Sequence, residues 1–95
     1  MKKAINVNGT SLQGYITIKF ADLVSVLGKP HFENGDKITA EWAIQIGDAV
    51  ITIYDYKEDV TPKGLYDWHV GGFDSSVVVT LQRLFPNYRV RNYRA

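Results

Sequence analysis

The sequence has 95 residues, of which 45% are hydrophobic and 22% are charged, and its formal net charge is +1. This length and composition indicate a single globular domain and exclude wholesale disorder. Because the chain contains no cysteine, disulfide frameworks, thiolate metal sites and cysteine nucleophiles are excluded as well.

The first predicted elements are a strand and a short helix. Residues 1–11 are rich in turn formers, and residues 12–18 alternate weakly and contain many β-forming residues, which predicts a strand. Over residues 20–27 the apolar side chains recur at the spacing of one helical face: Phe20, Leu23, Val24 and Leu27. Gly28 then stands where a helix commonly ends, and Pro30 follows, so the helix is expected to stop there.

The clearest pattern is a β-hairpin over residues 37–56. Apolar residues alternate along 37–46, Gly47-Asp48 supplies a two-residue turn, and the chain returns over 49–56. One register aligns the apolar sets of both strands by pairing Ile46 with Ala49, Ile44 with Ile51 and Trp42 with Ile53. A slip of one residue breaks all of these pairs, so the register is expected to be fixed.

The second face of this hairpin is less polar than a solvent-facing surface. Its returning strand carries four side chains there: Val50, Thr52, Tyr54 and Tyr56. A face of this kind is usually covered. One explanation is a helix of the same chain, and the other is a second subunit or a bound partner, because tyrosine is enriched at interfaces.

The rest of the chain predicts another strand, a helix and a short edge strand. Residues 66–70 alternate as a strand that Gly71-Gly72 ends, and a helix capped by Asp74 or Ser75 runs to about Phe85. Residues 88–93 form the edge strand. The expected fold is one small α+β domain over residues 1–95, with an antiparallel sheet of about four to five strands, two helices and the order β-α-β-β-β-α-β.

Charge is distributed unevenly along the chain. Residues 1–74 carry seven lysines and ten acids and sum to −3, whereas residues 75–95 carry four arginines and no acid. The basic C-terminal tail at 86–95 therefore suggests two alternatives. Its arginines cover the sheet or pair with acids such as Asp55, Glu58 and Asp59, or they form an anion-binding edge with Tyr88 and Tyr93.

A strand running through two glycines into a helix is the most suggestive candidate ligand site. Glycines permit close approach of the backbone to a ligand, and a helix N-terminus presents free amides. The candidate residues are Trp68, His69, Gly71, Gly72, Ser75, Ser76, Arg89 and Arg91. Asp74 argues against an anion at this place, and a structural turn is the alternative. If a phosphate binds here, Gly72→Val is expected to abolish binding and to leave the hairpin folded.

Patterns typical of catalysis or metal binding are not found. The two histidines, His31 and His69, have no metal-ligand spacing, and the acids of residues 55–59 lack the pattern of a calcium loop. Serine, histidine and aspartate are present but without a local nucleophile signature. The sequence therefore predicts a protein that is not an enzyme and that uses no metal and no cofactor.

Parts of the chain resemble small proteins of about 100 residues encoded by tailed bacteriophages and prophages. The resemblance covers roughly residues 10–85 and is sharpest in two strings, Ile53-Tyr54-Asp55-Tyr56-Lys57 and Trp68-His69-Val70-Gly71-Gly72. Shorter matches are Leu23-Val24, Gly28-Lys29-Pro30, Asp36-Lys37 and Glu41-Trp42. The resemblance implies an accessory protein of an infected bacterium, which often acts by binding a host defence protein or a nucleotide signal. It implies no individual site residue.

These features together predict a non-enzymatic binding protein of the bacterial cytoplasm, without a membrane segment. It is expected to form a homo-oligomer through a tyrosine-rich surface of Val50, Tyr54, Tyr56, Tyr88 and Tyr93. Its partner is a host protein, or a small anionic ligand such as a nucleotide. The alternative is a nucleic-acid-binding module that uses the arginines and tyrosines of the tail, although four arginines are few for that function.

Overall fold

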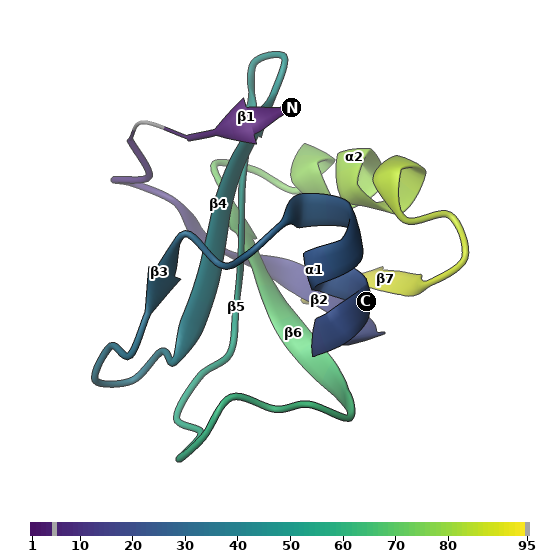
Figure 1. Ribbon diagram of the computed structural model, residues 1–95. Helices are drawn as coiled ribbons and strands as arrows, with labels where there is room; N and C mark the ends of the chain where they lie inside the picture. The colour runs from purple at the N-terminus through teal and green to yellow at the C-terminus, as the bar shows by residue number, and fades with distance from the viewer. Residues whose placement is uncertain (5, 95) are drawn as a thin grey trace.

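An antiparallel sheet and two helices make up the fold, which confirms the predicted α+β class (Figure 1). The computed structural model describes residues 1–4 and 6–94; Ile5, in the predicted turn-rich start, and Ala95, the last residue of the predicted tail, lie outside this part. The strands are β1 (Lys2–Lys3), β2 (Ser11–Lys19), β3 (Phe32–Glu33), β4 (Ala40–Ile46), β5 (Ala49–Tyr54), β6 (Leu65–Gly72) and β7 (Arg89–Asn92). The helices are α1 (Phe20–Leu27) and α2 (Ser76–Leu84).

The described residues thus contain two more strands than the sequence predicts. The main strands follow the order β1-β4-β5-β6-β2-β7, and β3 pairs with β4 beside β1. Both additional strands, β1 and β3, have two residues each and pair only with the outer edge of β4. Segments this short show no alternation, because their pairing depends on a distant strand rather than on local pattern.

The predicted register of the hairpin is confirmed. Strands β4 and β5 pair Ile46 with Ala49, Ile44 with Ile51 and Trp42 with Ile53. The predicted helix stop is also confirmed, since Gly28 follows α1 with a φ of 83° and its N–H donates to the Val24 carbonyl at 2.8 Å. A positive φ of this size favours glycine, so the local sequence alone determines where α1 ends.

The two tryptophans form the centre of the hydrophobic core. The rings of Trp42 and Trp68 are fully buried and pack edge to face, with centroids 5.5 Å apart. Each indole N–H is satisfied by a backbone carbonyl: Trp42 donates to Gly28 at 2.9 Å and Trp68 to Ile18 at 3.2 Å. Trp68 is therefore a core residue, which removes it from the predicted ligand site.

The outer edge of β4 is closed by a histidine side chain between β1 and β3. The backbone N–H of Ala43 donates to Nδ1 of His31 at 3.0 Å, and the His31 N–H donates to the Glu41 carbonyl at 2.9 Å. This arrangement requires an unprotonated Nδ1. Burial, and then the neighbouring Lys3 charge, lower the pKa of His31.

The protonation of His31 is expected to make stability depend on pH. Because the folded pKa lies below the unfolded value of about 6.5, the unfolded state binds the proton more readily. The contribution of His31 is therefore present above pH 6.5 and is lost as pH falls toward the folded pKa. His31→Gln keeps an acceptor but does not titrate, so its urea midpoint should fall less than that of the wild type between pH 7.5 and 5.5. An equal fall in both proteins would contradict this assignment.

Candidate functional site

One face of the sheet carries both helices, and the other carries none (Figure 1). Buried residues of α1 and α2 pack in a single core with the sheet residues Ile16, Ile53 and Trp68. Since side chains alternate along a strand, the residues next to these point to the opposite side. We call that opposite side the open face. Of the two explanations for this surface, cover by a helix of the same chain is wrong, because both helices lie against the core face. Ala43 and Thr52, which share the open face, are nevertheless buried within the described residues.

A continuous row of paired residues crosses the open face. The successive pairs of the sheet register are Phe32 with Glu41, Glu41 with Tyr54, Tyr54 with His69, His69 with Tyr15, and Tyr15 with Arg91. We call these six residues the cross-strand row. Directly paired residues point to the same side of a sheet, and five strand spacings of about 4.8 Å give the row a length of roughly 24 Å.

The middle of the row is an aromatic cluster around His69. The His69 ring stacks on Tyr54 with centroids 5.2 Å apart and meets Tyr15 edge-on, also at 5.2 Å. Tyr56 adds a third ring at 5.8 Å. Burial lowers the pKa of His69, and its Nδ1 is buried without a hydrogen-bond partner among the described residues. At neutral pH the cluster is thus an uncharged aromatic surface.

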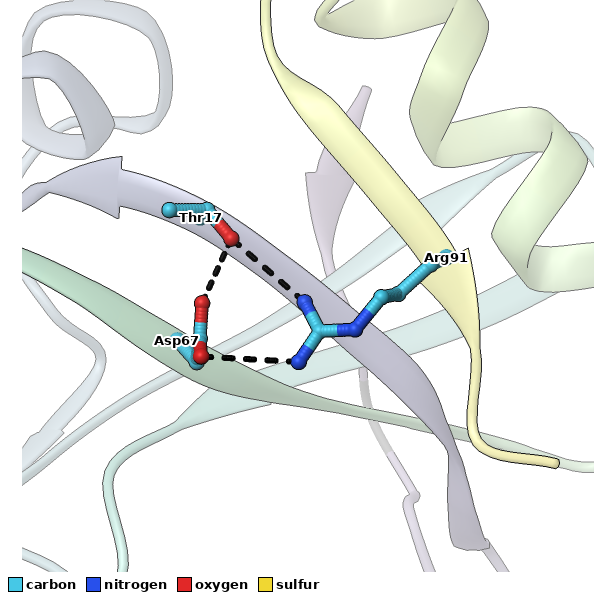
Figure 2. Close-up of polar contacts among 3 residues, drawn as sticks. All are labelled: Thr17, Asp67 and Arg91. Atoms are coloured by element: carbon cyan, nitrogen blue, oxygen red, sulfur yellow. Dashed lines mark hydrogen bonds and ion pairs between the residues drawn. The ribbon is translucent and has the colours of Figure 1, made fainter. Parts of the chain in front are cut away.

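One end of the row holds a fixed positive charge. The Thr17 hydroxyl donates to Asp67 at 2.5 Å, and the Arg91 guanidinium donates to Thr17 and to Asp67, each at 3.4 Å (Figure 2). The same guanidinium lies 4.8 Å from the centre of the Tyr15 ring. The Thr17 hydrogen bond, and then Arg91, lower the pKa of Asp67. These contacts from three neighbouring strands orient Arg91 across the open face.

Near the other end of the row stands an unpaired carboxylate. Glu41 is partly buried, and none of the described residues gives its side chain a hydrogen bond or an ion pair. Burial raises the pKa of Glu41, and the Glu41 charge adds to the burial that raises the pKa of Tyr54. A desolvated carboxylate without a cation is unfavourable, so this position is suited to a partner that brings a positive charge.

The two glycines predicted to form a turn lie inside strand β6 instead. Gly71 pairs with Thr52 and Leu12, and a Cβ atom there would overlap the Thr52 hydroxyl. A Cβ atom at Gly72 would lie 2.6 Å from the Val77 side chain of α2. Neighbouring side chains thus occupy the space next to both glycines. The predicted turn is wrong, and Gly72→Val is no clean test of ligand binding because it displaces α2.

The first turn of α2 has few amides available for an anion. The Asp74 carboxylate accepts hydrogen bonds from the backbone N–H of Ser76, at 2.9 Å, and from the Ser76 hydroxyl. The Ser76 hydroxyl is the main cause that lowers the pKa of Asp74. Backbone carbonyls take the next two amides, those of Val77 and Val78. An anionic ligand at this helix start would therefore meet a carboxylate and occupied donors.

The predicted ligand residues are consequently divided among different parts of the fold. His69, Arg89 and Arg91 belong to the open face, Trp68 to the core, and Gly71 and Gly72 to the sheet interior. Ser75 lines an open hollow of about 560 Å³ with residues 11–13 and 92–94. Ser76 borders a second hollow of about 240 Å³.

The predicted interface residues are also only partly brought together. Tyr54 and Tyr56 lie beside His69 on the open face, and Val50 shares that face one pair further along β5 from Thr52. Tyr88 instead packs against the core beside Phe85, and Tyr93 lines the larger hollow. Three residues of the row are not among the predicted site residues: Tyr15, Phe32 and Glu41. The alternation of residues 12–18 places Tyr15 opposite Ile16 and Ile18 and is the signal that identifies it.

The three acids suggested as partners of the arginines differ from one another in burial. Asp55 is fully buried, whereas Glu58 and Asp59 are exposed. The arginine that pairs with an acid is Arg91, and its partner is Asp67 rather than one of these three. Within the described residues, no group of three or more histidine, aspartate and glutamate side chains is arranged to hold a metal ion.

Comparison with protein-family models, with curated proteins and with solved structures gives no match for this chain. Neither helix in the described part of the chain has the length and the apolar character needed to cross a membrane.

Proposed function

We propose that this protein is a non-enzymatic binding protein that docks the open face of its sheet against the surface of another protein. The cross-strand row is the observation that carries this proposal. It places four aromatic rings, an oriented arginine and an unpaired glutamate on a face that no helix covers. Tyrosine, phenylalanine and arginine are the residue types enriched at the centre of protein interfaces.

The charges of the open face favour a protein over a nucleic acid as the partner. Nucleic-acid affinity depends on cations that neutralise phosphates. On this face Arg91 pairs with Asp67, and Glu41 adds a second carboxylate. Arg89 of β7 shares this face, whereas Arg83 lies on α2 and Arg94 follows β7. They form no single basic stripe, which argues against the alternative of a nucleic-acid-binding module.

A small anionic ligand finds less support than a protein partner. The hollow of about 560 Å³ contains one charged side chain, Arg94, and its other lining groups are polar or apolar without charge. The amides of the neighbouring helix start are already occupied. The open face combines aromatic area with charges of both signs, and a protein surface is the partner that uses both.

In the phage setting implied by the sequence resemblance, the docked surface belongs to a host protein of the bacterial cytoplasm. Docking then blocks the function of that surface of the host protein. The mechanism needs no turnover, because the complex itself is the effect. The effect is occupancy of a surface of the host protein. The affinity for that surface depends on the aromatic centre of the open face.

Truncating one ring of the open face is expected to weaken capture of the target strongly. Tagged protein would be incubated with a bacterial lysate, and the bound proteins identified by mass spectrometry. Tyr56→Ala should reduce the recovered target about 10-fold or more, because truncated interface aromatics often cost 2 kcal/mol. Tyr93→Ala is the matched control, since Tyr93 is 49% exposed and Tyr56 is 39% exposed, and it lies away from the open face. Loss with Tyr93→Ala and retention with Tyr56→Ala would contradict the proposal.

A further inference from the structure

We infer that a second copy of this chain occupies the open face in a two-fold, face-to-face dimer whose axis runs over His69. This inference rests on the proposed function, because it names an occupant of the same surface. In such a dimer the target and the second copy compete for one face. The order of side chains along the cross-strand row favours a second copy as the occupant.

The five residues of the row from Glu41 to Arg91 are arranged symmetrically about His69, and Phe32 at the Glu41 end has no counterpart. One strand spacing away on either side stands a tyrosine, Tyr54 or Tyr15, and two spacings away stands a charge, Glu41 or Arg91. A two-fold axis that lies in the interface, parallel to β6 and over His69, reverses the row end for end. It then places Tyr54 against the partner's Tyr15, and Glu41 against the partner's Arg91.

This axis brings a cation to Glu41, the one charged residue of the row that the described part of the single chain leaves without an ion pair. Glu41 has no cation among the described residues, and Arg91 keeps its guanidinium over Tyr15 with both contacts to Thr17 and Asp67 at 3.4 Å. The dimer makes two equivalent pairs of Glu41 with Arg91, one at each end. A two-fold axis along the row would instead place Glu41, which has no cation within residues 1–4 and 6–94 of its own chain, against a second Glu41. The axis over His69 places Asp67 of strand β6 against the partner's Asp67, but each Asp67 keeps its ion pair with Arg91 of its own chain.

The aromatic centre also suits sheet-on-sheet packing. Two sheets pack face to face about 10 Å apart, with side chains of both inner faces filling the space between them. The rings of Tyr15, Tyr54 and His69 on each chain supply this layer, and none of the three is fully exposed. An unrelated target has no reason to require opposite charges at equal distances from a central residue, whereas an isologous dimer does.

Charge reversal and complementation test the inference. The oligomeric state of the wild type, Glu41→Arg, Arg91→Glu and an equimolar mixture of the two variants would be measured by sedimentation velocity. The wild type is expected to be a dimer. Each variant alone should be a monomer, with a dissociation constant raised about 100-fold or more, because like charges then face each other at both ends. In the mixture residues 41 and 91 again face each other with opposite charges at both ends, so a mixed dimer should form.

The mixture also controls for folding, since misfolded variants cannot complement each other. Should Arg91→Glu fail to fold, the absence of native cysteine permits a second measurement. His69→Cys is expected to be linked to its partner by a short bismaleimide, because position 69 faces itself across the axis. Val79→Cys, on the exposed side of α2, is the control and should give no linked dimer. A linked dimer from position 79 alone would overturn the inference.

These experiments distinguish failure of the dimer from failure of the proposed function. A wild type that is monomeric throughout the micromolar range, or a mixture that stays monomeric, overturns the dimer. If Tyr56→Ala still loses the target in that case, the proposed function stands. A complementing dimer together with unchanged capture by Tyr56→Ala supports the dimer and contradicts the proposed function.

Discussion

Asp55→Ala is expected to lower the free energy of unfolding by about 3 kcal/mol, measured by urea denaturation, because it leaves one buried and two partly buried donors without this acceptor. Asp55 is fully buried, and its carboxylate accepts hydrogen bonds from the backbone N–H groups of Thr39, at 2.8 Å, and Ala40, at 3.1 Å. It also accepts a hydrogen bond from the Thr39 hydroxyl at 2.5 Å. This carboxylate thus joins the end of β5 to the beginning of β4.

Two further variants show whether the effect of Asp55→Ala comes from the lost hydrogen bonds. Asp59→Ala removes an exposed carboxylate from the same loop and should change stability by less than about 0.5 kcal/mol. Asp55→Asn keeps one acceptor oxygen, so its loss should lie between these values. If Asp55→Ala unfolds at the same urea concentration as Asp59→Ala, the buried hydrogen-bond cluster does not stabilise the hairpin.

Gly72→Val should destabilise the fold at least as strongly, because its side chain would occupy the space of Val77. Even a single Cβ at position 72 would lie 2.6 and 2.7 Å from the two methyl carbons of Val77. Gly72→Ala is therefore expected to cost about 1–3 kcal/mol, the usual range for overpacking, and Gly72→Val more. Thermal unfolding followed by circular dichroism measures both losses.

A compensating substitution makes the Gly72 prediction specific. Val77→Ala removes the methyl groups that the added Cβ meets, so the double variant Gly72→Ala/Val77→Ala should be less destabilised than the sum of the single variants. Gly64→Ala serves as control, since a Cβ there meets no atom within 4 Å. Strictly additive losses in the double variant would show that position 72 is not packed against Val77.

Local patterns were sufficient for much of the fold. Alternation and a two-residue turn predicted the β4–β5 register pair by pair, and helical spacing followed by Gly28 predicted α1 and its end. Strands β1 and β3 escaped prediction because they exist only through pairing with β4. Gly71 and Gly72 were assigned to a turn because the sequence does not show that Thr52 and Val77 fill the space beside them.

The candidate site was predictable in parts but not as a whole. Tyr54 and Tyr56 were predicted as interface residues, and His69 and Arg91 as ligand residues, yet they lie on one face. What joins them is the placement of β2 between β6 and β7, which pairs residues more than 50 positions apart. Such pairing leaves no local trace. For the same reason the role of Asp55 was missed, because its partner Thr39 is 16 positions away.

Contact between the open face and another protein molecule in the cell is the central expectation. A photoreactive phenylalanine derivative would be placed at position 15, in the cross-strand row, or at position 79, on the exposed side of α2. After irradiation of living bacteria, position 15 should give covalent products of at least twice the mass of the chain, and position 79 should give none. Products from position 79 together with none from position 15 would contradict the account.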